Sequence, residues 1–449
     1  MNTLKHLLAL SMTILLIAGC SSKKDESSDS SSSSNSEGAA CVTEVNNELL
    51  RTVDYNATAV LVANLESVFS TYSVDNAVIK DYDEFADLSS VVLVMPSLNG
   101  ESYTTFLIDN ADAFNTYANG NLTQLTDRGD FAVYANRYDD RYVMVKGSQM
   151  WVGRSPSSIE QSVKNAATRH FGQGLAISTS IEQPHSVNIA VNMSAIPNIK
   201  EYGSEFADAW GIANVDMTKS TITGDAKIIS SNGDAVMVPG MRELSTKFLN
   251  YTMGEPNVAL AMGIGKDFPW KTVQKVLTEA GADPSDLSLL PILGKMIDGT
   301  VSASVSIDSN SGEIYFSALI ESSNADPEAV IGMLQGFVGQ VSSTSDGFYS
   351  IPVDALPSGN IYLGAVGEAF FIGSHHPSQL SGNNNLQSVF SGNEAALSIN
   401  VPKSLMMMLT EGEGTFGLNG KVQVEKSTAH FEVKVTDTDM SIIEAFNKM

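Results

Sequence analysis

Five segments in the first half of the chain have counterparts, in the same order, in the second half. The clearest match runs without a gap between YVMVKGSQMWVGRSPSSIE at 142–160 and YLGAVGEAFFIGSHHPSQL at 362–380. Both segments read as a strand, a tight turn at a glycine, a second strand and the start of a helix. Self-similarity of this kind is the sequence signature of a repeated structural unit. The other four pairs are 56–69 with 257–270, 89–114 with 300–330, 185–199 with 393–407, and 220–234 with 420–437.

The repeat predicts two homologous domains, over residues 45–252 and 253–449. Turns at Asn99-Gly100 and at 309–312 indicate hairpins, and therefore antiparallel strand pairs. Helical patterns follow the hairpins, so we expect the α+β class, with antiparallel sheets and interspersed helices in both domains. Helix starts are predicted where a capping residue precedes a proline. Such pairs occur at Ser155-Pro156, Asp283-Pro284 and Asp326-Pro327.

The first nineteen residues have the pattern of a secretory signal peptide. Lys5 and His6 precede an apolar run over 7–17, which is shorter than the roughly 20 residues that a membrane-spanning helix needs. The run ends in Ile17-Ala18-Gly19-Cys20, which resembles a bacterial lipobox. That resemblance implies cleavage before Cys20 and acylation of Cys20. The membrane is thus an expected partner, through a lipid anchor on Cys20.

Residues 20–44 carry the lipidated cysteine and a serine-rich stretch that we expect to be a flexible tether. As a random coil, this segment would reach roughly 25–30 Å root-mean-square. Within it, Lys23-Lys24-Asp25-Glu26 resembles the export signal of surface lipoproteins in Bacteroidota. The resemblance implies an outer-membrane protein that faces outward. A solvated linker, on a protein that faces the periplasm, is the alternative.

The acidic balance of the chain narrows the choice of partners. Asp and Glu number 51 against 26 Lys and Arg, which gives a formal net charge of −25. Such a charge argues against nucleic acid and against docking to anionic headgroups. Cys41 is the only cysteine besides Cys20, so an intrachain disulfide and a cysteine-based zinc site are both excluded.

The lipoprotein signal, the tether and a repeated strand-then-helix opening together resemble a known family. The opening lies at Asn56–Phe69 and again at Asn257–Trp270. In these features the chain resembles the Bacteroidota lipoproteins grouped as DUF4836 and, less closely, DUF3352. That family more often carries Pro-X-Asp before the strand, where this chain has Asp54-Tyr55-Asn56 and Glu255-Pro256-Asn257. The resemblance covers residues 50–449 and implies no activity, catalytic residue or cofactor.

Motifs that carry chemistry are missing from the sequence. Nucleophile elbows, Walker loops, dinucleotide fingerprints and HExxH helices do not occur, and we predict no cofactor and no metal. His375 and His376 are adjacent, so their side chains should diverge, and we interpret them as exposed structural histidines.

Aromatic side chains give the one candidate ligand site, in YANRYDDRY at 134–142. Tyr134 and Tyr138 would share one face of a strand, and a turn at Asp139-Asp140 would bring Tyr142 beside them. A platform of these three tyrosines would stack on sugar rings. An ordinary cross-strand aromatic cluster is the alternative.

Taken together, the anchor, the tether, the repeat and the lack of paired catalytic groups favour a non-enzymatic surface lipoprotein. It would bind a protein or glycan partner, or act as an envelope scaffold. The alternatives are a hydrolase of glycan or peptide, with two carboxyl groups about 5–10 Å apart in a cleft, and glycan capture by Tyr134, Tyr138 and Tyr142.

Overall fold

A computed structural model describes most of the chain that follows residue 47. The signal peptide, Cys20, the tether and Cys41 lie outside the described residues, as do Asp283-Pro284 and Asp326-Pro327. The described residues are 48–72, 82–97, 100–173, 185–196, 204–236, 240–268, 297–322, 341–354, 356–382, 386–410, 415–425 and 427–436, with single residues at 270, 274, 278 and 294.

The described chain forms two compact units. The first comprises residues up to 219 together with 224–236, and the second comprises residues 237–449 together with 220–223. The expected boundary between residues 252 and 253 therefore lies inside the second unit. Residues 241–252 belong there because Arg242 N donates to Gly263 O (3.2 Å) and Leu244 N donates to Asn393 O (2.8 Å).

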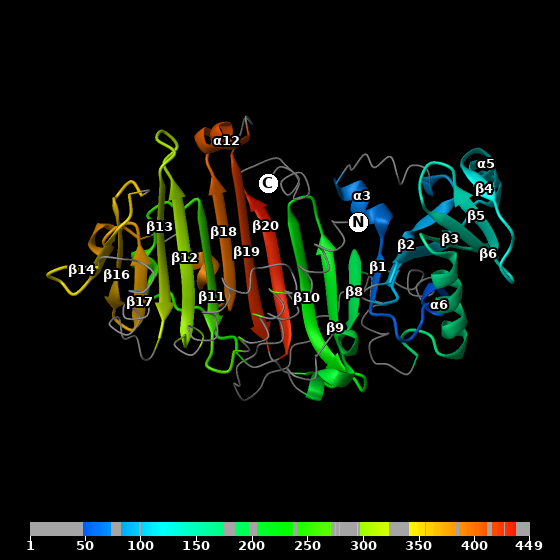
Figure 1. The fold of residues 1–449 in the computed structure, drawn as a ribbon, viewed down its shortest axis with the longest axis horizontal. Helices are drawn as coiled ribbons and strands as arrows, with labels where there is room; N and C mark the ends of the chain where they lie inside the picture. The colour runs from blue at the N-terminus through cyan, green and yellow to red at the C-terminus, as the bar shows by residue number, and fades with distance from the viewer. Residues whose placement is uncertain are drawn as a thin grey trace. The chain divides into compact units, whose positions relative to one another are not determined.

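Ten strands of the first unit follow one another in the order β4–β5–β6–β7–β3–β2–β1–β8–β9–β10 (Figure 1). The neighbouring pairs from β4 to β9 are antiparallel. Strand β1 is flanked by β2 and β8, so it is hydrogen-bonded on both edges. The strands are β1 (Ala59–Ala63), β2 (Ala86–Met95), β3 (Tyr103–Ile108), β4 (Leu122–Gln124), β5 (Ala132–Asn136), β6 (Tyr142–Lys146), β7 (Gln149–Gly153), β8 (Val187–Asn192), β9 (Ala209–Met217) and β10 (Thr221–Ser230).

Ten strands of the second unit have the same order, β14–β15–β16–β17–β13–β12–β11–β18–β19–β20 (Figure 1). All of these neighbours are antiparallel. The strands are β11 (Val258–Ile264), β12 (Gly299–Ile307), β13 (Ile314–Glu321), β14 (Ser342–Ser343), β15 (Tyr349–Pro352), β16 (Asn360–Val366), β17 (Ala369–Gly373), β18 (Ala395–Val401), β19 (Phe416–Glu425) and β20 (Thr428–Thr436).

The strand register is repeated as well as the strand order. Gly153 lies opposite both Tyr103 and Tyr142 in the first unit. Gly373 lies opposite Ser317 and Tyr362 in the second. The gapless sequence match at 142–160 and 362–380 therefore coincides with equivalent positions in the two units.

The opening strands β1 and β11 are equivalent in the two units. The number of residues that separates equivalent positions is two smaller than their sequence match indicates. Thr58 N donates to Met95 O (2.9 Å), and Asn257 N donates to Val305 O (2.8 Å) at the corresponding place. Thr58 therefore corresponds to Asn257, whereas the pairing of 56–69 with 257–270 aligns Thr58 with Ala259. Because side chains alternate with a period of two, this shift keeps every residue on its predicted face.

The prediction of an α+β class is wrong, because the fold is rich in β-structure and mostly antiparallel sheet. The elements described from end to end are twenty strands, five α-helices and four 3-10 helices. Hairpin follows hairpin, and the helices between them are short segments that pack on strands, such as α6 on β6 and β7. The helices are α3 (Leu65–Tyr72), α5 (Ala111–Asn121), α6 (Pro156–Thr168), α11 (Gln387–Phe390) and α12 (Lys403–Thr410), with η1 (Met193–Ala195), η3 (Ser204–Asp208), η4 (Leu249–Tyr251) and η5 (Pro377–Gln379).

Helix α6 begins as the sequence predicts. Ser155 is its N-cap, with the side chain accepting a hydrogen bond from Ser158 N, and Pro156 occupies the first turn. Ile159 is buried on the face that packs against the sheet. The predicted helix start at Ser155-Pro156 is confirmed.

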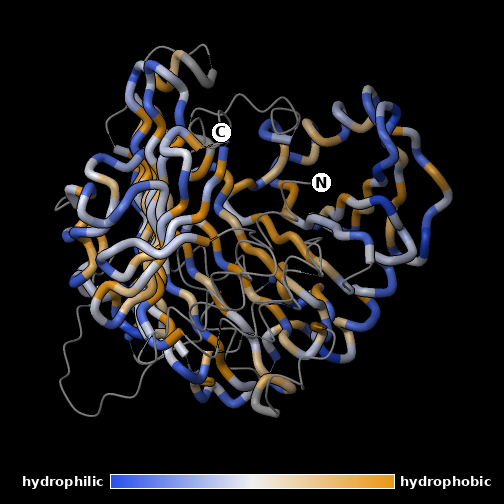
Figure 2. Tube along the Cα trace, turned by 60° about the vertical axis from the view of Figure 1, so that its left-hand side comes forward, coloured by the Kyte–Doolittle hydropathy of each residue, from blue (hydrophilic) through white to orange (hydrophobic). Residues whose placement is uncertain are grey.

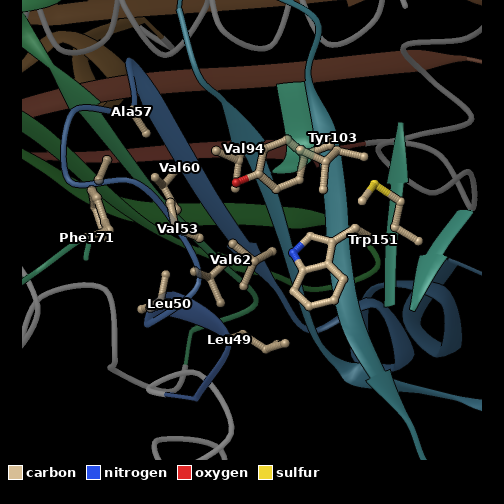
Figure 3. Packing of buried hydrophobic residues seen from close by; sticks show 14 of the residues in the cluster. Leu49, Leu50, Val53, Ala57, Val60, Val62, Val94, Tyr103, Trp151 and Phe171 are labelled. Atoms are coloured by element: carbon tan, nitrogen blue, oxygen red, sulfur yellow. The ribbon is translucent and has the colours of Figure 1, made fainter. Parts of the chain in front are cut away.

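The main core of the first unit forms where residues 49–57 fold back on β1. Leu49, Leu50 and Val53 lie against Val60 and Val62, with Tyr103 and Trp151 beside them (Figure 3). The indole of Trp151 also meets the ring of Phe131 edge-on, at 5.4 Å between centroids. Figure 2 shows the same trend along the chain, with apolar residues gathered in the strands and hydrophilic residues at the loops.

Candidate functional site

The three tyrosines of the predicted aromatic platform lie in one hairpin but not on one face. Tyr134 of β5 lies opposite Val143, and Tyr142 of β6 lies opposite Ala135. Because side chains alternate along a strand, Tyr134 and Tyr142 point to opposite faces of the hairpin. Tyr134 packs inward, edge-on to Phe114 at 6.2 Å. Tyr138 is in the turn, where 78% of its surface is exposed.

Polar and charged side chains hold the turn that carries Tyr138. Asn136 Oδ1 accepts from Tyr138 N at 2.9 Å. Asp139 Oδ1 accepts from Arg141 N at 2.9 Å, and Asp140 pairs with Arg154 at 3.1 Å. Desolvation raises the pKa of Asp139, but the hydrogen bonds from Arg141 outweigh it and leave that pKa below its usual range. The structure therefore presents one exposed tyrosine on an ordered turn.

A cluster that sequence reasoning missed lies around His376 in the second unit. Its imidazole packs edge-on against Phe348 at 4.8 Å and against Tyr362 at 5.6 Å. Only 18% of the side chain is exposed. His376 is therefore not the exposed structural histidine that we expected. Its neighbour His375 lies apart, against Tyr315 at 4.9 Å, so the two side chains diverge as predicted.

Both ring nitrogens of His376 have polar neighbours. Nδ1 lies 2.8 Å from Ser378 Oγ and also accepts from Ser378 N at 3.4 Å. Nε2 lies 2.9 Å from Asp346 Oδ2. Nε2 makes no hydrogen bond of acceptable geometry, so this is a close contact that becomes an ion pair only when the ring is protonated.

These contacts define the protonation of the cluster. Because Nδ1 accepts from the backbone N–H of Ser378, the neutral ring carries its hydrogen on Nε2, facing Asp346. A hydrogen bond from Thr344 outweighs the desolvation of Asp346 and holds the pKa of this carboxyl below its usual range. The arrangement is thus a hydroxyl 2.8 Å from an imidazole nitrogen that also accepts from the Ser378 backbone N–H, with a carboxylate at the other ring nitrogen.

The adjacent 3-10 helix fixes the backbone of this cluster. His376 is the N-cap of η5, Pro377 is in its first turn, and His376 N donates to Gln379 Oε1 at 3.0 Å to complete a capping box. Asp346 comes from the loop between β14 and β15, about thirty residues earlier in the chain. The His-Pro-Ser-Gln cap could have been found in the sequence, whereas nothing in the sequence places Asp346 beside it.

The described residues contain neither a cluster of metal ligands nor a membrane-spanning helix. Within these residues, no group of three or more His, Cys, Asp or Glu side chains is arranged to hold a metal ion. None of the helices in the described part of the chain is long and apolar enough to span a membrane. Cys20 lies outside the described residues, so its lipidation remains a prediction.

Comparisons with known proteins identify no family. No family model matches the chain, and no curated protein matches it. The resemblance to DUF4836 therefore remains a prediction. Among solved structures, crystal form IV of TP0453 is similar at a TM-score of 0.27 and 10% identity, over 40% of this chain and 79% of that one. Crystal form I of TP0453 gives 0.26 and 9%, over 41% and 79%. Similarity at these TM-scores carries no argument about fold or function.

Proposed function

We propose that the chain is a lipid-anchored envelope protein that presents a β-rich body for binding or scaffolding. The observation that carries the proposal is the sequence Ile17-Ala18-Gly19-Cys20, directly after an apolar run and before a serine-rich stretch. Two or more acyl chains on one cysteine are enough for stable anchoring, whereas a single chain binds only marginally.

The first core residues lie a few positions beyond the end of the predicted tether at residue 44. Leu49 and Leu50, among the first described residues, are 0% and 3% exposed and pack in the main core of the first unit. The stretch between Cys20 and this core is polar and rich in serine. It would therefore hold the body at a distance from the membrane without forming part of it.

The ordered turn at Tyr138 is the contact that we propose for a protein partner. Exposed tyrosines combine a large apolar surface with a hydroxyl, and they are enriched at protein interfaces. The ion pairs of Asp139 and Asp140 fix the turn before binding, so little conformational entropy would be lost there. Glycan stacking by three tyrosines has no comparable support, since Tyr134 and Tyr142 face apart.

Metabolic labelling with a palmitate analogue tests the anchor. The wild-type protein should carry the label and fractionate with membranes, while Cys20→Ala should lose both. Cys41→Ala is the matched control, because Cys41 is the other cysteine of the chain, and it should behave like the wild type. Label that persists in Cys20→Ala would contradict the proposal.

A further inference from the structure

We propose that Ser378 is a nucleophilic serine, activated by His376 as general base, that accepts acyl groups from activated carboxylic esters. This activity goes beyond the anchoring and binding role proposed above. Asp346 is a positioning residue for the imidazole. All three residues lie in the second unit.

The distances bring a hydroxyl, an imidazole and a carboxylate together. A nucleophile and its base must lie within hydrogen-bond reach, with a third group orienting the base. Here Ser378 Oγ is 2.8 Å from His376 Nδ1, and Asp346 Oδ2 is 2.9 Å from His376 Nε2. Compared with serine proteases, where Nε2 takes the proton, the two ring nitrogens have exchanged roles.

The surroundings keep the base in place and leave the nucleophile open. Phe348 and Tyr362 pack edge-on against the ring of His376 and restrict its rotation. Thr344 Oγ1 donates to Asp346 Oδ1 at 2.6 Å and fixes the carboxylate. Ser378, in contrast, is exposed, so a substrate in solvent can reach its hydroxyl.

The repeat supplies an internal comparison. After β7, the first unit has Ser155-Pro156-Ser157 at the helix start, where the second unit has His376-Pro377-Ser378 after β17. Ser155 caps its helix with a hydroxyl, which is an ordinary capping group, and Ser157 Oγ lies 3.1 Å from that hydroxyl. Capping therefore needs no imidazole and no carboxylate behind it. The second unit has both, beside a serine that likewise lies two residues after the cap, one residue beyond its place in the gapless match of 142–160 with 362–380.

The proposed step transfers the acyl group from the ester to Ser378 Oγ. Ser378 Oγ attacks the ester carbonyl carbon while its proton moves to His376 Nδ1. The tetrahedral intermediate then expels the alcohol oxygen, which takes the proton from Nδ1 and leaves as the alcohol. The acyl group remains on Ser378 as an ester, and the imidazole is again neutral. Attack by water through the same base would release the carboxylic acid and free serine.

Covalent labelling of the full chain tests the proposal. A fluorophosphonate probe and p-nitrophenyl acetate are the reagents, and peptide mass mapping locates the adduct. We expect the adduct on Ser378, and none on Ser157. Ser378→Ala should abolish it. His376→Asn keeps a capping side chain but removes the base, and should slow labelling at least about tenfold, because a positioned base contributes about 100-fold or more.

Further variants separate activation from folding. Ser157→Ala should label like the wild type, and the thermal midpoint of His376→Asn should match the wild type within a few degrees. Asp346→Asn should slow labelling of Ser378 while the thermal midpoint stays within a few degrees of the wild type, since it removes the carboxylate beside the imidazole. An absent adduct at Ser378, equal labelling of Ser157, or an unchanged rate in a folded His376→Asn would overturn the proposal. Each of these results leaves the palmitate experiment on Cys20 unaffected.

Discussion

Two glycines show how single residues fix the repeated hairpin. Gly147 joins β6 to β7 with φ +62°, and Gly367 joins β16 to β17 with φ +59°. Nothing lies within 4 Å of a Cβ added at either position, so the requirement for glycine is conformational and not steric. In this left-handed region an L side chain costs about 1–2 kcal/mol.

Gly147→Ala and Gly367→Ala should therefore each lower the free energy of unfolding by about 1–2 kcal/mol. Chemical denaturation of the full chain measures this change. Gly120→Ala is the matched control, because Gly120 lies in helix α5 and also has no atom within 4 Å of an added Cβ. There the substitution should stabilise by up to about 1 kcal/mol. A loss of stability in the control equal to that at Gly147 would contradict this explanation.

The same scale shows where sequence reasoning succeeds and where it fails. The equivalence of Gly147 and Gly367 can be read from the sequence, because turn and flanking strands are contiguous. The tyrosine platform cannot be read from the sequence, because the face on which each tyrosine lies depends on the strand register across the turn. Tyr142 pairs with Ala135, the residue after Tyr134. A shift of one residue in the register turns a side chain to the opposite face of the sheet.

At the scale of elements, a buried asparagine fixes where three strands begin or end. Asn257 precedes β11, and its Oδ1 accepts from Ile307 N at 2.6 Å, at the end of β12. Its Nδ2 donates to Asn400 O at 2.9 Å, in β18. Its backbone carbonyl accepts from Asn400 N at 2.7 Å. One side chain thus satisfies backbone groups of two strands on either side of β11.

Asn257→Ala should lower the free energy of unfolding by about 1–3 kcal/mol, because the part-buried N–H of Ile307 and C=O of Asn400 each lose a hydrogen bond. Hydrogen exchange of the Ile307 amide gives the local readout and should become faster. Asn56→Ala is the control, since Asn56 is exposed just before β1. It should stay within about 0.5 kcal/mol of the wild type. Slow exchange at Ile307 in Asn257→Ala would show that the side chain does not hold the strand end.

The strands were predictable because the alternation of apolar and polar residues along a strand is a local pattern. The cap of α6 was predictable for the same reason. The fold class was not predictable, because it depends on how many strands pair in one sheet, and that number is not a local property of the sequence. Contacts such as β3 with β7, or β13 with β17, join strands separated by other hairpins. The approach of Asp346 to His376 depends on such non-local pairing, and the sequence carries no signal for it.

At the scale of the whole molecule, two units repeat one strand order while their helix starts have diverged. Serine caps α6, whereas histidine with Asp346 behind it caps η5. Residues 1–44 carry a different kind of information. We propose that they address and anchor the chain, and that the body that follows presents its loops to partners. Two units with the same topology and different side chains at equivalent places are expected, because one fold can hold different functional sites.

The anchor is the central claim of this account, and the mass of the N-terminal peptide tests it most directly. The protein should be extracted from membranes with detergent, digested, and its first peptide measured by mass spectrometry. We predict that this peptide begins at Cys20 and carries acyl groups on the sulfur and the amino terminus. A first peptide that begins at Met1, or that contains an unmodified Cys20, would contradict the account.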